Sequence, residues 1–340
     1  MRILYLSRDM RGYTGATYQR EFLSALEARS DVKIWGPGYP DFNPQLDWVA
    51  LRNGMSWDPD AIVVGHSWLA DNIKVPIDPH PTLELGSVDI PKVFVLNKEY
   101  ARLSDKIQFA SKIRVSLLVS HHHRVEQYAL PVNAQPLFLP FAVAQDRITR
   151  VAPRKEQDLT FSGILRNPSY SQSQSNFRLE VQRMLFRTLS DYPIALRKSF
   201  QGFRIKWLPH YGDVRDWVAR LSKGPRLSEK DYWQMLTQSA TVLNGLSPLG
   251  LVGTRYFETL ASQGVPVVEE SDIYKHIPGI DKFFLPIESD GKGLHEVLTW
   301  VVSNPSQVRS LARAGAHEVA THHTWDVRAR DLVEAITSLT

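Results

Sequence analysis

The segment from Ser239 to Glu270 (SATVLNGLSPLGLVGTRYFETLASQGVPVVEE) holds residues whose types and spacing suit anion binding. Its pattern predicts a buried strand, a loop punctuated by glycines, and a helix that begins near Thr254. Glycines let the backbone approach a ligand closely, and the free N–H groups at the start of a helix favour an anion such as a diphosphate. We expect Thr254 to be the helix N-cap and Arg255 to add a fixed positive charge there.

Glu258 lies one turn further along this helix, and the sequence leaves two interpretations open. It follows Arg255 by three positions, so the two side chains share a helix face and could form a surface ion pair that contributes ~0.2 to 0.5 kcal/mol. Alternatively, the carboxylate accepts hydrogen bonds from ribose hydroxyls, as acidic residues commonly do in nucleotide sites.

The elements that must position these residues have an α/β pattern. A strand is predicted at Arg2–Ser7, then a loop with Gly12 and Gly15, an amphipathic helix and a second strand at Asp31–Trp35, which together make a βαβ unit. Apolar runs predict further buried strands at Ala61–Val64, Val93–Leu96 and Val115–Val119. The run PLFLPFAV at Pro136–Val143 and the polar stretch after it have no periodicity, and we interpret them as a linker between domains.

The strand pattern restarts at Leu159–Leu165, so 340 residues are expected to form two α/β domains whose strands end at a common cleft. We place the first domain, on the acceptor side, at residues 1–145 and the second, on the donor side, at residues 146–320. The last segment, 321–340, is predicted to be a helix that can cross back to the first domain.

The C-terminal part resembles a known family. The stretch RYFETLASQGVPVVEE is preceded by SATVLN and followed by KFFLPIESD and a helical C-terminal segment. Together these are similar to GT-B glycosyltransferases of the family 4 type, and most similar to the CgeB-like (spore maturation) subgroup, over roughly the last hundred residues. The motif Glu-Ala-Leu-Ala-x-Gly-x-Pro-Val is matched here by Glu258, Thr259, Leu260, Ala261, Gly264, Pro266 and Val267, with one residue more between the alanine and the glycine. In the first half, the similarity rests only on the strand and glycine-loop opening, on VGHS and on LVSHHH.

The resemblance implies two Rossmann-like domains facing across a cleft and the transfer of a hexose or pentose from a UDP- or GDP-linked sugar to an acceptor hydroxyl. It implies retention of the anomeric configuration, with no divalent metal, no other cofactor and no protein nucleophile. Many family 4 enzymes have a further glutamate eight positions before the one matched by Glu258, whereas this chain has Gly250 there. The donor sugar is therefore open.

The resemblance also implies roles for individual residues. Glu258 would hold the ribose, and Gly253, Thr254 and Arg255 would face the diphosphate. Arg166 would be a cation for the leaving phosphate, so Arg166, Arg255 and His66 are the catalytic candidates. The other candidates for binding the nucleotide sugar are Gly12, Gly15, Gly163, Lys230 and Asn244.

Several histidines and acidic residues have competing interpretations. His66 ends a predicted strand, where it could orient the acceptor or transfer a proton, or only bond to backbone. The triplet His121–His123 suggests zinc, but consecutive side chains point in different directions. Asp58 and Asp60 resemble a metal-binding Asp-x-Asp motif, yet they precede a strand instead of following one. We therefore expect no metal site.

Composition excludes several classes of protein. The chain has no cysteine, so disulfides, thiolate nucleophiles and cysteine-ligated metals are excluded. No stretch approaches the ~20 apolar residues of a membrane span, and the start MRILYLSRDM lacks the apolar core of a secretory signal. We expect a cytoplasmic protein.

The charge distribution keeps alternatives open. Residues 147–230 contain 17 Lys and Arg against 7 Asp and Glu, within a chain of net charge +4 and pI near 9.1. These cations could be solvated helix faces, at positions such as Arg183 and Arg187, or a groove for phosphates. A DNA glycosyltransferase acting on a hydroxymethylated base is therefore one alternative. A non-catalytic module that binds nucleotide sugars and, less favoured, an epimerase on the same fold are others.

Overall fold

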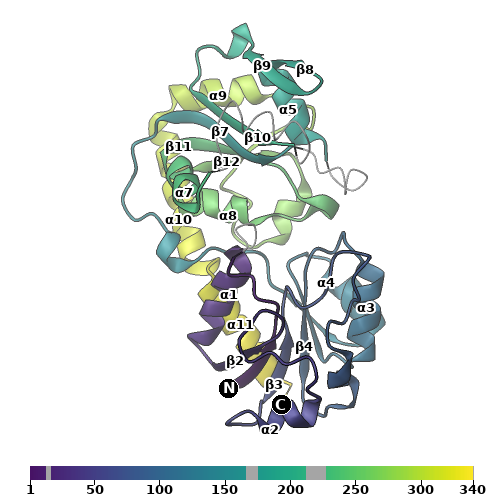
Figure 1. Cartoon of the computed structure of the whole chain (residues 1–340). Coiled ribbons are helices and arrows are strands. Elements are labelled where there is room, and N and C mark those ends of the chain that lie inside the picture. Colours follow the sequence, from purple (N-terminus) through teal and green to yellow (C-terminus); the bar gives the residue numbers. More distant parts are fainter. Residues whose placement is uncertain (13–16, 166–174, 212–226, 340) are drawn as a thin grey trace. The chain divides into compact units, whose positions relative to one another are not determined.

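The computed structural model describes residues 1–12, 17–165, 175–211 and 227–339. The chain forms two compact units (Figure 1). The first contains Met1–Ala144 together with Trp325–Thr340, and the second contains Gln145–Thr324. The site candidates Gly15 and Arg166 lie outside the described residues.

The first unit is built on a six-stranded parallel sheet of order β2-β1-β3-β4-β5-β6. Its central strands are apolar and buried on both faces, as expected for a parallel sheet between two helical layers. The strands are β1 (Arg2–Leu6), β2 (Asp31–Trp35), β3 (Ala61–Val64), β4 (Lys92–Leu96), β5 (Leu117–Ser120) and β6 (Gln135–Phe138).

Helices cover both faces of this sheet (Figure 1). On one face, α1 packs against α11, and the ring of Phe22 lies 5.7 Å from that of Trp325. On the other, buried residues of α3 and α4 join a core that includes Leu4, Ile62 and Phe94. The helices of the unit are α1 (Thr17–Glu27), α2 (Trp48–Asn53), α3 (Leu103–Lys112), α4 (Val125–Ala129) and α11 (Trp325–Thr337).

The interpretation of Pro136–Val143 as a linker is wrong. Residues 135–138 form β6, which pairs with β5, and Leu139, Phe141 and Val143 are buried. The periodicity was missing because β6 is a short, partly exposed edge strand, where a proline such as Pro136 is tolerated.

The second unit repeats this architecture with a five-stranded parallel sheet of order β10-β7-β11-β12-β13. Buried residues of α5 and α9 pack on one face of the sheet, and Met235 and Leu236 of α7 pack on Val242 of the other. Its strands are β7 (Gln157–Ile164), β10 (Ile205–His210), β11 (Ser239–Asn244), β12 (Val265–Glu269) and β13 (Leu285–Ile287), and its helices are α5 (Phe177–Leu185), α7 (Glu229–Gln238), α8 (Thr254–Ala261), α9 (Leu294–Ser303) and α10 (Pro305–His322).

An antiparallel hairpin, β8 (Phe186–Leu189) with β9 (Tyr192–Leu196), follows α5. The helical pattern expected at Arg187 is therefore wrong, because Arg187 lies in β8, whereas Arg183 does lie in α5. The helix ends at Leu185, and Ser190 and Asp191, which both have positive φ, form the tight turn between the two strands.

Both sheets have a point at which the strand order reverses. In the first unit, the chain proceeds outward from β1 to β2 and then resumes on the other side of β1 with β3. In the second, it does the same around β7, so the reversal lies between β7 and β11. Ligands of open α/β sheets bind outside the carboxyl ends of the strands at such a reversal.

Candidate active site

Two glycines and a carboxylate lie side by side at the strand reversal of the second unit. Continued past the last paired residues, the register of β11 with β7 places Gly245 beside Gly163, and the register of β11 with β12 places it beside Glu269. These three residues therefore form a row across the carboxyl ends of β7, β11 and β12.

Each of the two glycines makes room for a guanidinium group. A Cβ atom at Gly163 would lie 2.7 Å from Arg255 Nη1, and one at Gly245 would lie 2.8 Å from Arg178 Nε. Contacts this short are not found in proteins, so a larger residue would displace the arginines. Gly163, a predicted site residue, is thus brought to Arg255, also predicted.

Arg178, on α5, is a site residue that the sequence did not single out. Its Nη1 donates to the carbonyl of Ile164 at 3.0 Å and its Nη2 to that of Gly245 at 2.7 Å, so it joins the ends of β7 and β11. Burial, and then the charge of Arg255, lower the pKa of Arg178 to about 10. Arg178 and Arg255 are thus neighbouring cations, and neither has a direct carboxylate partner among the described residues. Such a pair favours a bound anion.

The helix α8 begins next to these cations. Its N-cap is Gly253, whose φ of −81° and ψ of 170° are extended, and Thr254 is already helical. The prediction that Thr254 is the N-cap is therefore wrong by one residue. Glycine has no side chain to cap the helix, so the N-terminus keeps backbone N–H groups that can face a phosphate.

Glu258 and Arg255 are connected through a third residue, Tyr232 of α7. The Tyr232 hydroxyl donates to Glu258 Oε2 at 2.6 Å and accepts from Arg255 Nε at 3.4 Å. Burial raises the pKa of the Glu258 carboxyl, and the bond from Tyr232 and the charge of Arg255 oppose that rise. The group is thus a partly buried, oriented carboxylate and differs from a solvated surface pair.

We expect Tyr232→Phe to weaken nucleoside diphosphate binding by about 10-fold, since a hydrogen bond to a charged group contributes ~1.5 to 3 kcal/mol and the carboxylate loses its orientation. Titration calorimetry with UDP and GDP measures this change. Gln234→Ala, at an exposed position of the same helix, is the matched control. Equal affinities for both variants would show that the tyrosine only packs.

Three other predicted positions have different surroundings. The amide Nδ2 of Asn244 donates to the carbonyl of Val242 at 3.0 Å and to Thr259 Oγ1 at 3.2 Å, so it ties β11 to α8. Lys230 is exposed on α7. Gly250 has a φ of +80°, and a Cβ there would lie 2.4 Å from Ile273 Cδ1, so the fold has no room for a glutamate at this position.

A match to a known family covers the part of this site that lies on β11, α7, α8 and β12. Residues 187–334 match the family model described as glycosyl transferase-like. Solved structures share the fold over the whole chain. HepE from Anabaena, in complex with UDP and glucose, has a TM-score of 0.62 at 10% identity, covering 99% of this chain and 100% of that one.

Two further structures agree with it. Sucrose-phosphate synthase from Thermosynechococcus elongatus has a TM-score of 0.62 at 12% identity, covering 100% of this chain and 99% of that one. A glycosyltransferase from Rickettsia africae has a TM-score of 0.59 at 9% identity, covering 99% and 98%. The chain therefore has the GT-B fold of these glycosyltransferase structures. No curated protein matches its sequence.

In the first unit, His66 is part of a buried hydrogen-bonded chain. His121 Nδ1 lies 2.6 Å from the carbonyl of Leu139 and must donate to it, so His121 Nε2 accepts. His66 Nε2, 2.7 Å away, is then the donor, and His66 Nδ1 accepts from the Tyr5 hydroxyl at 3.4 Å. This bonding favours a structural His66, and its catalytic role stays a prediction.

The histidine pair predicts that the enzyme loses stability in acid. Burial lowers the pKa of His121 to about 4 and that of His66 well below its usual range. Between pH 6.5 and 4, the unfolded chain then binds protons that the folded chain does not, so stability falls as the pH falls. His121 alone would account for ~3 kcal/mol of this loss of stability, at about 1.4 kcal/mol per pKa unit.

Urea denaturation at pH 7 and pH 4.5 tests this prediction. We expect His121→Gln to show a smaller acid loss than the wild type, because one titrating group is gone. His317→Gln, at an exposed position of α10, is the control and should keep the wild-type slope. An unchanged slope in His121→Gln would contradict the role of the pair.

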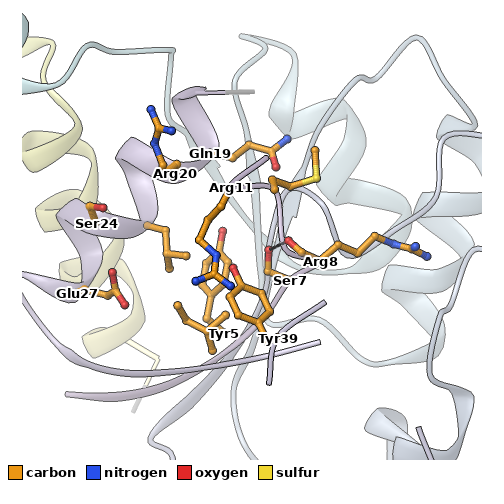
Figure 2. A pocket seen from close by; sticks show the side chains of 12 residues that line it. Tyr5, Ser7, Arg8, Arg11, Gln19, Arg20, Ser24, Glu27 and Tyr39 are labelled. Atoms are coloured by element: carbon orange, nitrogen blue, oxygen red, sulfur yellow. Dashed lines mark hydrogen bonds between the residues drawn. The ribbon is translucent and has the colours of Figure 1, made fainter. Parts of the chain in front are cut away.

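The first unit also contains a cavity of about 360 Å³ between β1, β2 and α1 (Figure 2). Its apolar lining includes Tyr5, Leu23 and Ile34. In Figure 2, the Arg11 side chain ends beside the ring of Tyr39. The Arg11 guanidinium carbon lies 5.4 Å from the centre of that ring. The predicted site residue Gly12 follows Arg11 and is exposed, and a Cβ atom added to it would meet no described atom within 4 Å.

The two aspartates of the Asp-x-Asp motif each bond to an arginine of the first unit. Arg52 Nε donates to Asp58 at 2.6 Å, and the backbone N–H of Arg2 donates to Asp60 at 2.7 Å. Within the part of the chain that the structure describes, no group of three or more histidine, aspartate or glutamate side chains could hold a metal ion. Over the same residues, no helix is long and apolar enough to cross a membrane.

Proposed function

We propose that this enzyme transfers a hexose or pentose from a UDP- or GDP-linked sugar to an acceptor hydroxyl, that it does so with retention and without a divalent metal, and that it is of the CgeB-like type. The single observation that supports the donor most directly is the pair of guanidinium groups of Arg178 and Arg255 at the N-terminus of α8. HepE, which shares the fold, is described in complex with UDP and with UDP-glucose.

The chemistry follows from the charges of the site. As the bond from the anomeric carbon to the diphosphate breaks, negative charge grows on the leaving phosphate. Cations and helix N–H groups that are already in place stabilise that charge. Arg255 and the N-terminus of α8 have this role in the proposal, and Glu258 holds the ribose. The departing phosphate itself accepts the proton of the acceptor hydroxyl, so no protein nucleophile is required.

We infer that the acceptor binds to the first unit. The cavity of Figure 2 supports this inference, because its lining combines apolar side chains with hydrogen-bond donors and acceptors, including Ser24, Glu27 and Arg11. Such a lining suits a hydroxylated ring, which has an apolar face and hydrogen-bonding edges.

A thermal shift screen with UDP, GDP and their glucose and mannose conjugates tests the donor. A ligand at 100 times its dissociation constant adds ~2.7 kcal/mol of stability, which raises the melting temperature measurably. We expect one nucleoside diphosphate and its conjugate to stabilise the protein. If none does, the donor assignment is refuted.

Activity measurements separate the alternatives. Slow release of the nucleoside diphosphate from its sugar, unaffected by EDTA, supports the transferase, whereas binding without turnover supports a non-catalytic module. A changed sugar without any acceptor would indicate an epimerase. The anomeric configuration of the transferred sugar, read by NMR, tests retention.

The structure does not favour DNA as the acceptor. Three arginines of the basic segment, Arg147, Arg183 and Arg204, each pair with a carboxylate within the same unit, which reduces the charge available to a phosphate backbone. Affinity for duplex DNA that does not change with salt would eliminate this acceptor, since phosphate contacts weaken steeply with ionic strength.

A further inference from the structure

Two polar atoms beside Gly245 have no hydrogen-bond partner among the residues that the structure describes. They are Nε of Arg178 and Oε2 of Glu269, and both are shielded from solvent. The other polar atoms of these side chains are satisfied, since Arg178 donates to backbone carbonyls and Glu269 Oε1 accepts from Ser175 Oγ at 2.9 Å. A buried donor or acceptor without a partner costs ~1 to 3 kcal/mol, so this arrangement calls for a bound group.

The position of these atoms connects them to the diphosphate site. Glu269 ends β12 in the row that contains Gly245 and Gly163, and Arg178 is close to Gly245 and interacts with the charges of both Glu269 and Arg255. A group bound here would therefore be next to a diphosphate held by Arg255 and the N-terminus of α8.

The hydrogen-bonding roles of the two atoms define the missing group. Arg178 Nε can only donate, and an ionised Glu269 Oε2 can only accept. A hydroxyl both accepts and donates, so it is a group that can satisfy either atom. Phosphate oxygens would suit Arg178 but would be repelled by the carboxylate, and an apolar group would satisfy neither.

We propose that Glu269, with Arg178, binds a hydroxyl of the donor sugar and so makes the enzyme prefer a nucleotide sugar over the free nucleoside diphosphate. This proposal rests on the proposed function, because it takes a nucleotide sugar as the ligand of the second unit. It assigns the sugar subsite to the carboxyl end of β12. Ser175, whose hydroxyl also accepts from the backbone N–H of Phe177 at the start of α5, positions the carboxylate.

The test compares free and sugar-linked nucleotides on Glu269→Gln. Calorimetry with UDP, UDP-glucose, GDP and GDP-mannose gives, for each variant, the ratio of the affinity for the conjugate to that for its nucleoside diphosphate. Glutamine keeps the size of the side chain but loses its charge. We expect the ratio to fall roughly 10-fold or more, while the affinity for the nucleoside diphosphate changes less than about 2-fold.

Glu270→Gln is the matched control, since the next residue in the chain is also a glutamate but is exposed. It should keep the wild-type ratio. Donors that each lack one hydroxyl, such as deoxy analogues of UDP-glucose, add a second readout. The loss of the hydroxyl that contacts Glu269 should weaken binding to the wild type but have little further effect in Glu269→Gln.

The outcomes separate this inference from the proposed function. If Glu269→Gln weakens the binding of UDP or GDP as much as that of their conjugates, or leaves the ratio of the two affinities unchanged, the contact between Glu269 and the sugar is overturned. The nucleotide site stands in either case, and a water molecule fills the gap. If the wild type binds no nucleotide at all, the proposed function fails, and this inference fails with it.

Discussion

Replacing Arg255 with alanine is expected to lower kcat by ~10²-fold or more, by analogy with the loss of one preorganised electrostatic stabiliser. The guanidinium of Arg255 lies over Gly163 at the carboxyl end of β7 and at the N-terminus of α8. The negative charge of the leaving phosphate would develop there, so the arginine stabilises the transition state more than the ground state. Initial-rate measurements with a saturating nucleotide sugar test this expectation.

Two further variants make the Arg255 result specific. Arg255→Lys keeps a positive charge and should recover part of the lost rate, although a single ammonium cannot reproduce the geometry of a guanidinium. Arg313→Ala removes an exposed arginine of α10 and should leave kcat unchanged. Wild-type kcat in Arg255→Ala would show that this cation does not act on the leaving group.

Replacing Glu258 with alanine is expected to weaken binding of the nucleoside diphosphate by ~100-fold while leaving the fold intact. A carboxylate that accepts two ribose hydroxyls contributes hydrogen bonds to a charged group, each of ~1.5 to 3 kcal/mol. Removing it does not cost stability in the same way, because burial already disfavours its charged form. Calorimetry with UDP or GDP, together with a melting curve without ligand, measures both effects.

The comparison with Tyr232→Phe refines this prediction. Since Tyr232 contacts Glu258 at 2.6 Å, the two substitutions should not be additive: Tyr232→Phe should have little further effect in a Glu258→Ala background. If Glu258→Ala binds the nucleoside diphosphate with unchanged affinity, Glu258 does not bind the ribose.

Several features of the fold could be predicted because they depend on short-range pattern. The strands at Arg2–Leu6, Ala61–Val64 and Ser239–Asn244 are apolar runs of the length that a buried parallel strand requires. The linker prediction failed at β6 because this edge strand is partly exposed and so lacks the continuous apolar run of a buried strand. The predicted N-cap of α8 was wrong by one residue, since both Gly253 and Thr254 are acceptable N-caps by residue type.

The sequence by itself determined the glycine loop, the helix from Thr254 and the pair of Arg255 and Glu258, because these residues are within one loop and one helix and their relation follows from helical spacing. Only the tertiary structure decided that Tyr232, Arg178 and Glu269 join them. These three lie on different elements, and only the register of β7, β11 and β12 and the packing of α5 and α7 bring them to one edge. The physical reason is that a site at the ends of parallel strands combines residues far apart in the chain. Their proximity in space cannot be predicted from the spacing of residues within one segment.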